Sequence, residues 1–307
     1  MRFCFIIEEQ YKNEPMPLVI ADQIAQWGHE VDLLEPNHQA TDLSNMANQG
    51  YDAYVLKTIS GGPGMSILEA AESLGITTVN NSRAIRMARD KAVSIAVARA
   101  YGFPVPQTYF VAHESLLSKL PPEIYPLVIK PCDGSSCQGI YHLESPDDLA
   151  TIDFAANDYR FLLAQRYAEN PGFDIKLYVT GTEVYAVVKK SPLHPDVQEG
   201  LIPVKPEWRK LALGIGKAFG LDIYGIDVVD TPQGPIILDI NDFPSFGLVP
   251  RAVARISEYI LHAATRAESR QLAKIERQKR RASKFIASQA ANPSAANHDD
   301  NLIHIQS

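Results

Sequence analysis

The stretch YGIDVVDTPQGPIILDINDFPSF, residues 224–246, decides our expectation for the fold. Two apolar runs flank the turn residues Thr231 to Gly234, which predicts a β-hairpin. Asp239 and Asn241 are two residues apart, so on a strand both side chains leave the same face. The hairpin would bring Asp227 of the first run close to that face.

These side chains offer two carboxylates and one amide oxygen, all of them hard oxygen donors. In proteins Mg²⁺ is held by one or two carboxylates together with substrate phosphates. An unpaired carboxylate in an apolar sheet is costly, so three such groups on buried strands call for a reason. The pattern predicts one or two Mg²⁺ ions, with Mn²⁺ as an alternative metal, on Asp227, Asp239 and Asn241. The other interpretation is a set of strand-end residues exposed to water.

A second stretch, PLVIKPCDGSSCQGIYHL at residues 126–143, predicts a phosphate site. A short apolar strand ends at Lys130, a loop from Asp133 to Gly139 follows, and a second strand begins at Ile140. Glycines let backbone N–H groups close over a polyphosphate, and the lysine adds a point charge. The chain has no Walker A motif, and a strand rather than a helix follows these glycines, so a dinucleotide fingerprint is not indicated. Alone, the stretch also fits an ordinary turn.

Together the two stretches resemble the ATP-grasp superfamily, over a region from about Arg83 to about Ile260. Arg89-Asp90-Lys91 is similar to the R-D-K that begins the family's nucleotide region. Lys130 and the loop after it resemble the second nucleotide lysine and the phosphate loop. Residues 161–167, FLLAQRY, resemble the hinge segment that reaches the adenine.

The resemblance implies an α/β ATP-grasp fold, ATP and magnesium as cofactors, and Asp227, Asp239 and Asn241 as metal ligands. It implies ATP binding by these residues: Lys91, Lys130, Gly134, Ser135, Ser136, Gly139, Gln165, Arg166 and Tyr167.

Within the superfamily the chain is similar to two branches. RimK-type glutamate ligases and glutathione synthetases carry D-I-R after the hinge, where this chain has Asp174-Ile175-Lys176. They commonly carry an arginine one strand later, where Lys189 and Lys190 stand here. Inositol polyphosphate kinases carry a lysine at the position of Lys176 and an ending similar to residues 239–244.

The resemblance leads us to expect an ATP-dependent carboxylate–amine ligase that joins amino acids or peptides through an acyl phosphate. Lys176 and Lys190 would hold that acyl phosphate, and no enzyme nucleophile is needed because such transfer is mostly positioning and electrostatics. A small-molecule kinase, in which a hydroxyl attacks, is the alternative. A nucleotide-binding regulator without turnover is the third hypothesis.

Four regions are predicted along the chain. Residues 1–80 alternate strands with helices, which indicates a Rossmann-like parallel sheet. Residues 81–165 would form the small subdomain of the ATP-grasp fold, and residues 166–264 the magnesium-binding subdomain. Residues 265–307 are first basic and then rich in Ala, Asn and Ser, which predicts a basic helix and a disordered tail.

Three further features carry open alternatives. Lys57 ends a strand of the first region, where ligands of open α/β sheets bind. The run Ser60–Gly64 opens a helix whose amides could hold an anion, although a tight turn with an N-cap is the interpretation that we favour. His194 lies in a predicted loop, either as a substrate contact or general base, or as an ordinary loop residue.

Composition limits the function classes. The 307 residues carry a formal charge of −7, which does not favour nucleic-acid binding, although the basic segment leaves room for an anionic partner. No signal peptide and no membrane helix are indicated, and three cysteines make no secreted disulfide framework. We therefore expect a cytoplasmic protein with a small-molecule or peptide substrate, and the sequence leaves a homo-oligomer open.

Overall fold

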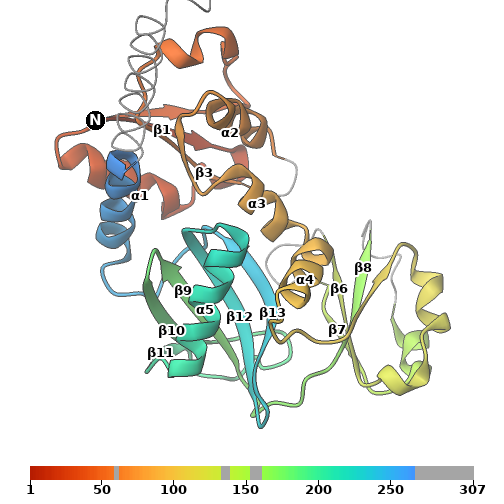
Figure 1. Ribbon diagram of the computed structural model, residues 1–307. Coiled ribbons are helices and arrows are strands. Elements are labelled where there is room, and N and C mark those ends of the chain that lie inside the picture. Colours follow the sequence, from red (N-terminus) through yellow and green to blue (C-terminus); the bar gives the residue numbers. More distant parts are fainter. Residues whose placement is uncertain (59–61, 133–138, 153–160, 267–307) are drawn as a thin grey trace, which may run out of the picture. The chain divides into compact units, whose positions relative to one another are not determined.

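A computed structural model describes residues 1–58, 62–132, 139–152 and 161–266 (Figure 1). The chain divides into two compact units, Met1–Leu261 and His262–Ser307, and the elements below belong to the first. The predicted phosphate-loop residues Gly134, Ser135 and Ser136 and the tail after residue 266 lie outside the described residues. Within the described part of the chain the strands form three sheets.

The first sheet is parallel, as predicted, with the strand order β2-β1-β3-β4. Buried apolar side chains fill both central strands, because helices cover a parallel sheet on its faces. The strands are β1 (Arg2–Ile7), β2 (Glu30–Leu34), β3 (Ala53–Lys57) and β4 (Thr77–Val79), and the helices between them are α1 (Pro15–Gln26) and α2 (Gly64–Ser73).

The second sheet is antiparallel, with the order β5-β8-β6-β7. One face packs Leu127, Ile129 and Ala164 into an apolar core. The register pairs Lys130 with Leu163 and places both on the opposite face. The strands are β5 (Thr108–Val111), β6 (Leu127–Pro131), β7 (Tyr141–Leu143) and β8 (Leu162–Arg166).

The third sheet has the order β11-β10-β9-β12-β13, and its β12–β13 pair is the hairpin predicted at residues 224–246. Asp227 lies directly opposite Asp239, and a bulge follows between Asp227 and Val228. The bulge was not predicted. The strands are β9 (Asp174–Thr180), β10 (Glu183–Lys189), β11 (Gly200–Ile202), β12 (Ile223–Thr231) and β13 (Gly234–Asp242).

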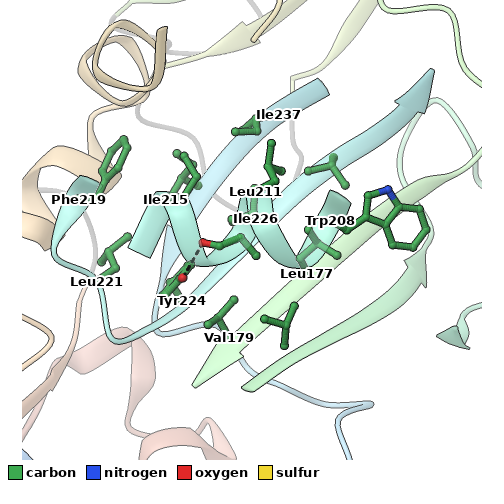
Figure 2. Close-up of a cluster of buried hydrophobic side chains, with 14 of the residues drawn as sticks. Leu177, Val179, Trp208, Leu211, Ile215, Phe219, Leu221, Tyr224, Ile226 and Ile237 are labelled. Atoms are coloured by element: carbon green, nitrogen blue, oxygen red, sulfur yellow. Dashed lines mark hydrogen bonds between the residues drawn. The ribbon is translucent and has the colours of Figure 1, made fainter. Parts of the chain in front are cut away.

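Helix α5 (Pro206–Phe219) packs apolar side chains against one face of this third sheet (Figure 2). The other face carries Lys176, Asp227 and Asp239. Each large apolar side chain buried there contributes roughly 1.5–3 kcal/mol. The helix and sheet contact closely at Tyr224, whose hydroxyl donates to the carbonyl of Ala212 at 2.8 Å. A Cβ at Gly216 would lie 2.3 Å from that hydroxyl oxygen, so glycine is required at this point of α5. The labelled core residues are Leu177, Val179, Trp208, Leu211, Ile215, Phe219, Leu221, Tyr224, Ile226 and Ile237.

The remaining helices lie on either side of the strands of the second and third sheets in the sequence. Residues 82–101, expected as one or two helices, form α3 (Ser82–Arg89) and α4 (Lys91–Ala100), divided at Asp90. Its carboxylate accepts from the amides of Ala92 and Val93, which is an N-cap. Alanines of both helices join the core under α5. A final helix begins at residue 252.

A 3₁₀ segment follows Ser145, and it begins with a capping box in which Asp148 accepts from the amides of Glu144 and Ser145. The 3₁₀ segments are η1 (Glu9–Tyr11), η2 (Leu43–Asn48), η3 (Glu114–Lys119), η4 (Pro122–Ile124) and η5 (Pro146–Thr151).

The first and third sheets take their strands from the ranges 1–80 and 166–264, the second sheet takes its strands from 81–165 except that β8 ends at Arg166, and the boundaries themselves stay predictions. Among the described residues, none of the helices has the length and apolar character to cross a membrane.

Candidate active site

One lysine connects the second and third sheets. The ammonium of Lys130 on β6 donates to the carbonyl oxygen of Leu238 on β13 at 2.7 Å, although 108 residues separate them. Lys130 is only 7% exposed. Leu238 directly precedes Asp239, so this contact brings the predicted phosphate lysine beside a predicted metal ligand.

The three predicted metal ligands share one face of the third sheet. Asp227 and Asp239 are cross-strand partners, and Asn241 lies two residues beyond Asp239 on the same side. The amide nitrogen of Asn241 donates to a carboxylate oxygen of Asp227 at 2.9 Å. Lys91, at the start of α4, places its ammonium 3.8 Å from a carboxylate oxygen of Asp239. The predicted grouping of these side chains therefore exists.

Lys176 lies across the same face from the neighbouring strand β9. Its ammonium lies 3.0 Å from the carboxylate of Asp227, its cross-strand partner. Burial alone would lower the pKa of Lys176, but Asp227, Tyr178 and Asp239 together outweigh burial, and the pKa is raised above its usual value. The side chain reaches Asp227 over Gly225, where an added Cβ would lie 3.0 Å from Cε of Lys176.

The surroundings of Lys130 change its pKa in the opposite direction. Burial lowers its pKa, and the nearby Lys91 lowers it further, while Asp239 and Asp227 only partly compensate. Its one described hydrogen-bond acceptor is a neutral carbonyl oxygen. Lys130 is therefore a buried cation with less negative charge around it than Lys176 has.

The donor set fits a magnesium ion. Asp227 and Asp239 keep 30% and 20% of their side chains exposed, so their oxygens can reach a ligand. No group of three or more His, Cys, Asp or Glu side chains in the described ranges could hold a metal. A site of two carboxylates and one amide agrees with that finding, because the third donor would come from Asn241.

The predicted hinge residues lie on β8 and just after it. Gln165 is buried, sits on the same face as Lys130, and donates from its side chain to the hydroxyl of Thr108 at 3.0 Å. Arg166 is exposed, and the ring of Tyr167 contacts the ring of His142 in a tilted arrangement, with the ring centroids 4.6 Å apart. Gly139, which ends the predicted phosphate loop, has a left-handed backbone with φ of +69°. Among the described residues of the second sheet that were predicted to bind ATP, Gln165 and Lys130 therefore share one face.

The two lysines predicted after the hinge differ in position. Lys189 is the cross-strand partner of Asp174, so it shares the face of Lys176, and its ammonium lies 2.7 Å from the carboxylate of Glu199. Lys190 follows the end of β10 and its side chain is exposed. The strand register thus places Lys189 on the face that carries Lys176, whereas Lys190 lies beyond the end of the strand.

A buried ion pair that the sequence did not predict joins Arg89 to Asp242. Asp242 directly follows Asn241, so its side chain leaves the opposite face of β13, and it is 2% exposed. Burial raises the pKa of its carboxyl, while Arg89 opposes that rise. The arginine of the R-D-K segment thus holds α3 to β13, and the lysine of the same segment turns to Asp239.

The glycine-rich start of α2 binds a carboxylate, but this carboxylate is a side chain of the protein itself. The carboxylate of the fully buried Glu8 accepts from the amide of Gly64 and the hydroxyl of Thr58, each at 2.8 Å. A Cβ at Gly62 would lie 2.2 Å from this carboxylate. Lys57 is also buried and pairs with Glu14 at 2.6 Å. In the first sheet these polar and charged groups are therefore hydrogen-bonded or ion-paired with one another.

Solved structures share this fold. A RimK domain ATP-grasp protein from Sphaerobacter thermophilus superposes with a TM-score of 0.65 at 19% identity, over 85% of this chain and 100% of that one. A D-alanine–D-alanine ligase from Bacillus anthracis superposes with a TM-score of 0.67 at 16% identity, over 88% and 99% of the two chains. The architecture is that of the ATP-grasp proteins, which confirms the predicted fold class.

The sequence comparison defines the family more closely. Residues 88–254 match the RimK-like ATP-grasp domain. A Haemophilus influenzae protein named "Probable alpha-L-glutamate ligase" is 27% identical over 268 residues, spanning 76% of this chain and 89% of that protein. The chain belongs to the RimK-like ATP-grasp family. This confirms the resemblance to RimK-type ligases and places the chain among enzymes that form C–N bonds.

Proposed function

We propose that this protein is an ATP- and Mg²⁺-dependent carboxylate–amine ligase that acts through an acyl phosphate. The observation that carries the proposal is the contact between Lys130 and Leu238, because it sets a phosphate-binding cation beside Asp239. Asp227 and Asn241 are hydrogen-bonded to each other on the same face. Positive charge for phosphate and oxygen donors for a metal thus lie together.

In the first step, a substrate carboxylate oxygen attacks the γ-phosphorus of ATP, the bond from that phosphorus to the bridging oxygen of the β-phosphate breaks, and ADP leaves with the electron pair. Lys130 and Lys91 would offset negative charge on the phosphates from the two sides of Asp239. Asp227, Asp239 and Asn241 would hold Mg²⁺, which supplies charge stabilisation on the phosphate oxygens. The protein contributes position and electrostatics and needs no covalent nucleophile.

In the second step, an amine attacks the acyl carbon and phosphate leaves. Lys176, held at 3.0 Å from Asp227, lies on the face where the acyl phosphate would form, and would stabilise its oxygens. We propose the same role for Lys189, which the strand register places on that face, in preference to Lys190. Gln165, Arg166 and Tyr167 would line the adenine end.

The relatives suggest the substrate class. The Haemophilus protein is named for L-glutamate, so we propose an amino acid or short peptide substrate, with L-glutamate as the first amine to test. The face that carries Lys176 and Lys189 suits an anionic substrate.

The experiment follows the γ-phosphate. The full chain is incubated with labelled ATP, Mg²⁺, L-glutamate and pools of amino acids and short peptides. We expect free phosphate together with a condensed product by mass. Asp239→Ala should reduce turnover on the order of 100-fold or more, because one transition-state charge contact is lost. Label retained on an organic acceptor would contradict the ligase proposal and indicate a kinase.

A further inference from the structure

His194 is held more firmly than a loop histidine needs to be. Its side chain is 11% exposed, and Nδ1 lies 3.2 Å from the carboxylate of Asp174 on β9. Its backbone amide donates to the hydroxyl of Ser191 at 3.2 Å, and the two residues form a β-bridge. The ring is therefore positioned both by its own loop and by a neighbouring strand.

This pair lies beside the surface used by the proposed ligase. Asp174 precedes Lys176 by two residues on β9, so both side chains leave the same face, about 7 Å apart along the strand. Lys189, directly across from Asp174, is on that face too and is paired with Glu199. His194 thus adjoins the face that would hold an acyl phosphate.

The contact with Asp174 also determines the tautomer of the ring. An ionised carboxylate only accepts hydrogen bonds, so Nδ1 of His194 must carry the hydrogen. In the neutral ring Nε2 then has a free lone pair, and no hydrogen bond of Nε2 is seen within the described ranges. A carboxylate that orients a histidine in this way is the arrangement by which a general base is prepared.

We propose that His194, oriented by Asp174, accepts the proton of the attacking amine in the second step, an inference that rests on the proposed ligase function. The lone pair of the amine nitrogen forms the C–N bond. The bond between the acyl carbon and the phosphate oxygen breaks, with its electron pair going to phosphate. The amine proton moves to Nε2, and the imidazolium is stabilised by Asp174 through Nδ1–H.

The test separates the two steps of the reaction. Hydroxylamine attacks acyl phosphates without help from a base, so it reports the first step, while amide formation reports both. The probes are ATP, Mg²⁺, a short peptide ending in glutamate as the carboxylate, and either hydroxylamine or L-glutamate as the amine. His194→Gln is the central variant, because an amide can still donate to Asp174 and keep the loop in place.

We expect amide formation by His194→Gln to fall by about 100-fold or more, with hydroxamate formation within about twofold of the unaltered chain. Asp174→Asn should lower the ratio of amide to hydroxamate in the same direction. His38→Gln is the matched control, since His38 is exposed and its ion-pair partners among the described residues are the carboxylates of Glu9 and Glu35. Its ratio should stay unchanged.

An equal loss of both products in His194→Gln, at an unaltered melting temperature, would show a positioning role in the first step and overturn the proposal. An unchanged ratio would overturn it as well. If the unaltered chain forms neither product, the ligase function itself fails, which is a different result from a changed ratio.

Discussion

Two lysines on neighbouring sheets, Lys130 buried and Lys176 half-buried, have different surroundings. Lys176 lies 3.0 Å from the carboxylate of Asp227, and its pKa is raised. Lys130 lies 2.7 Å from a carbonyl oxygen, and its pKa is lowered by burial. Lys176 thus has a carboxylate as its hydrogen-bond partner, whereas Lys130 has a neutral carbonyl oxygen.

The difference indicates which lysine awaits an anion from outside. A buried cation whose hydrogen bond goes to a neutral carbonyl rather than to a carboxylate is unfavourable, and a bound phosphate would relieve that cost. Lys176 already has an internal partner, so a ligand there must compete with Asp227. We therefore assign nucleotide binding chiefly to Lys130 and the chemical step chiefly to Lys176.

The largest expected effect is on nucleotide binding in Lys130→Met. The substitution keeps the length of the side chain and removes the charge, so the affinity for a non-hydrolysable ATP analogue should fall on the order of 1000-fold. Isothermal titration calorimetry measures it, with the exposed Lys119→Met as control. An affinity within a factor of about three of the unaltered chain would contradict the assignment.

The same substitution at Lys176 should act on turnover instead. We expect the rate of the ligase reaction to fall about 100-fold in Lys176→Met, because charge on the acyl phosphate loses its stabilisation. The analogue affinity should change much less than in Lys130→Met. Equal losses of affinity in the two variants would remove the distinction between the lysines.

Gly225→Ala should also lower turnover, but by less than Lys176→Met does. The added Cβ would lie 3.0 Å from Cε of Lys176 and 3.1 Å from Cγ of Pro244, so the lysine must shift away from Asp227. We expect turnover to fall about tenfold with little change in analogue affinity. Gly247→Ala, where an added Cβ meets nothing within 4 Å, is the matched control.

The pH dependence of binding should show the smallest effect. Because the pKa of Lys130 is lowered from 10.5, the folded chain loses this proton before the unfolded chain does as the pH rises. Between the two pKa values the unfolded state binds more protons, so this residue's contribution to stability rises with pH there. Analogue affinity should instead weaken, by about threefold over the start of that range. Lys130→Arg, which stays charged, should remove the weakening in titrations across the same pH values.

The features that could be predicted from the sequence are those that local sequence patterns determine. Alternation along residues 224–246 identified the hairpin and the shared face of Asp239 and Asn241, because strand geometry alone dictates both. The pairing of Asp227 with Lys176 depends on β9 lying next to β12, an order that no local pattern specifies. The role of Glu8 at the start of α2 was missed for the same reason, since its partners lie 50 and 56 residues away.

The contact of Lys130 with Leu238 has one more consequence. An ammonium has three N–H donors, and committing one of them to a fixed carbonyl oxygen restricts where the other two point. That carbonyl belongs to the peptide unit that leads directly into Asp239. The ammonium and the carboxylate therefore share a single reference point in the backbone, and a displacement of β13 would carry both together, so their mutual alignment would survive motion between the sheets.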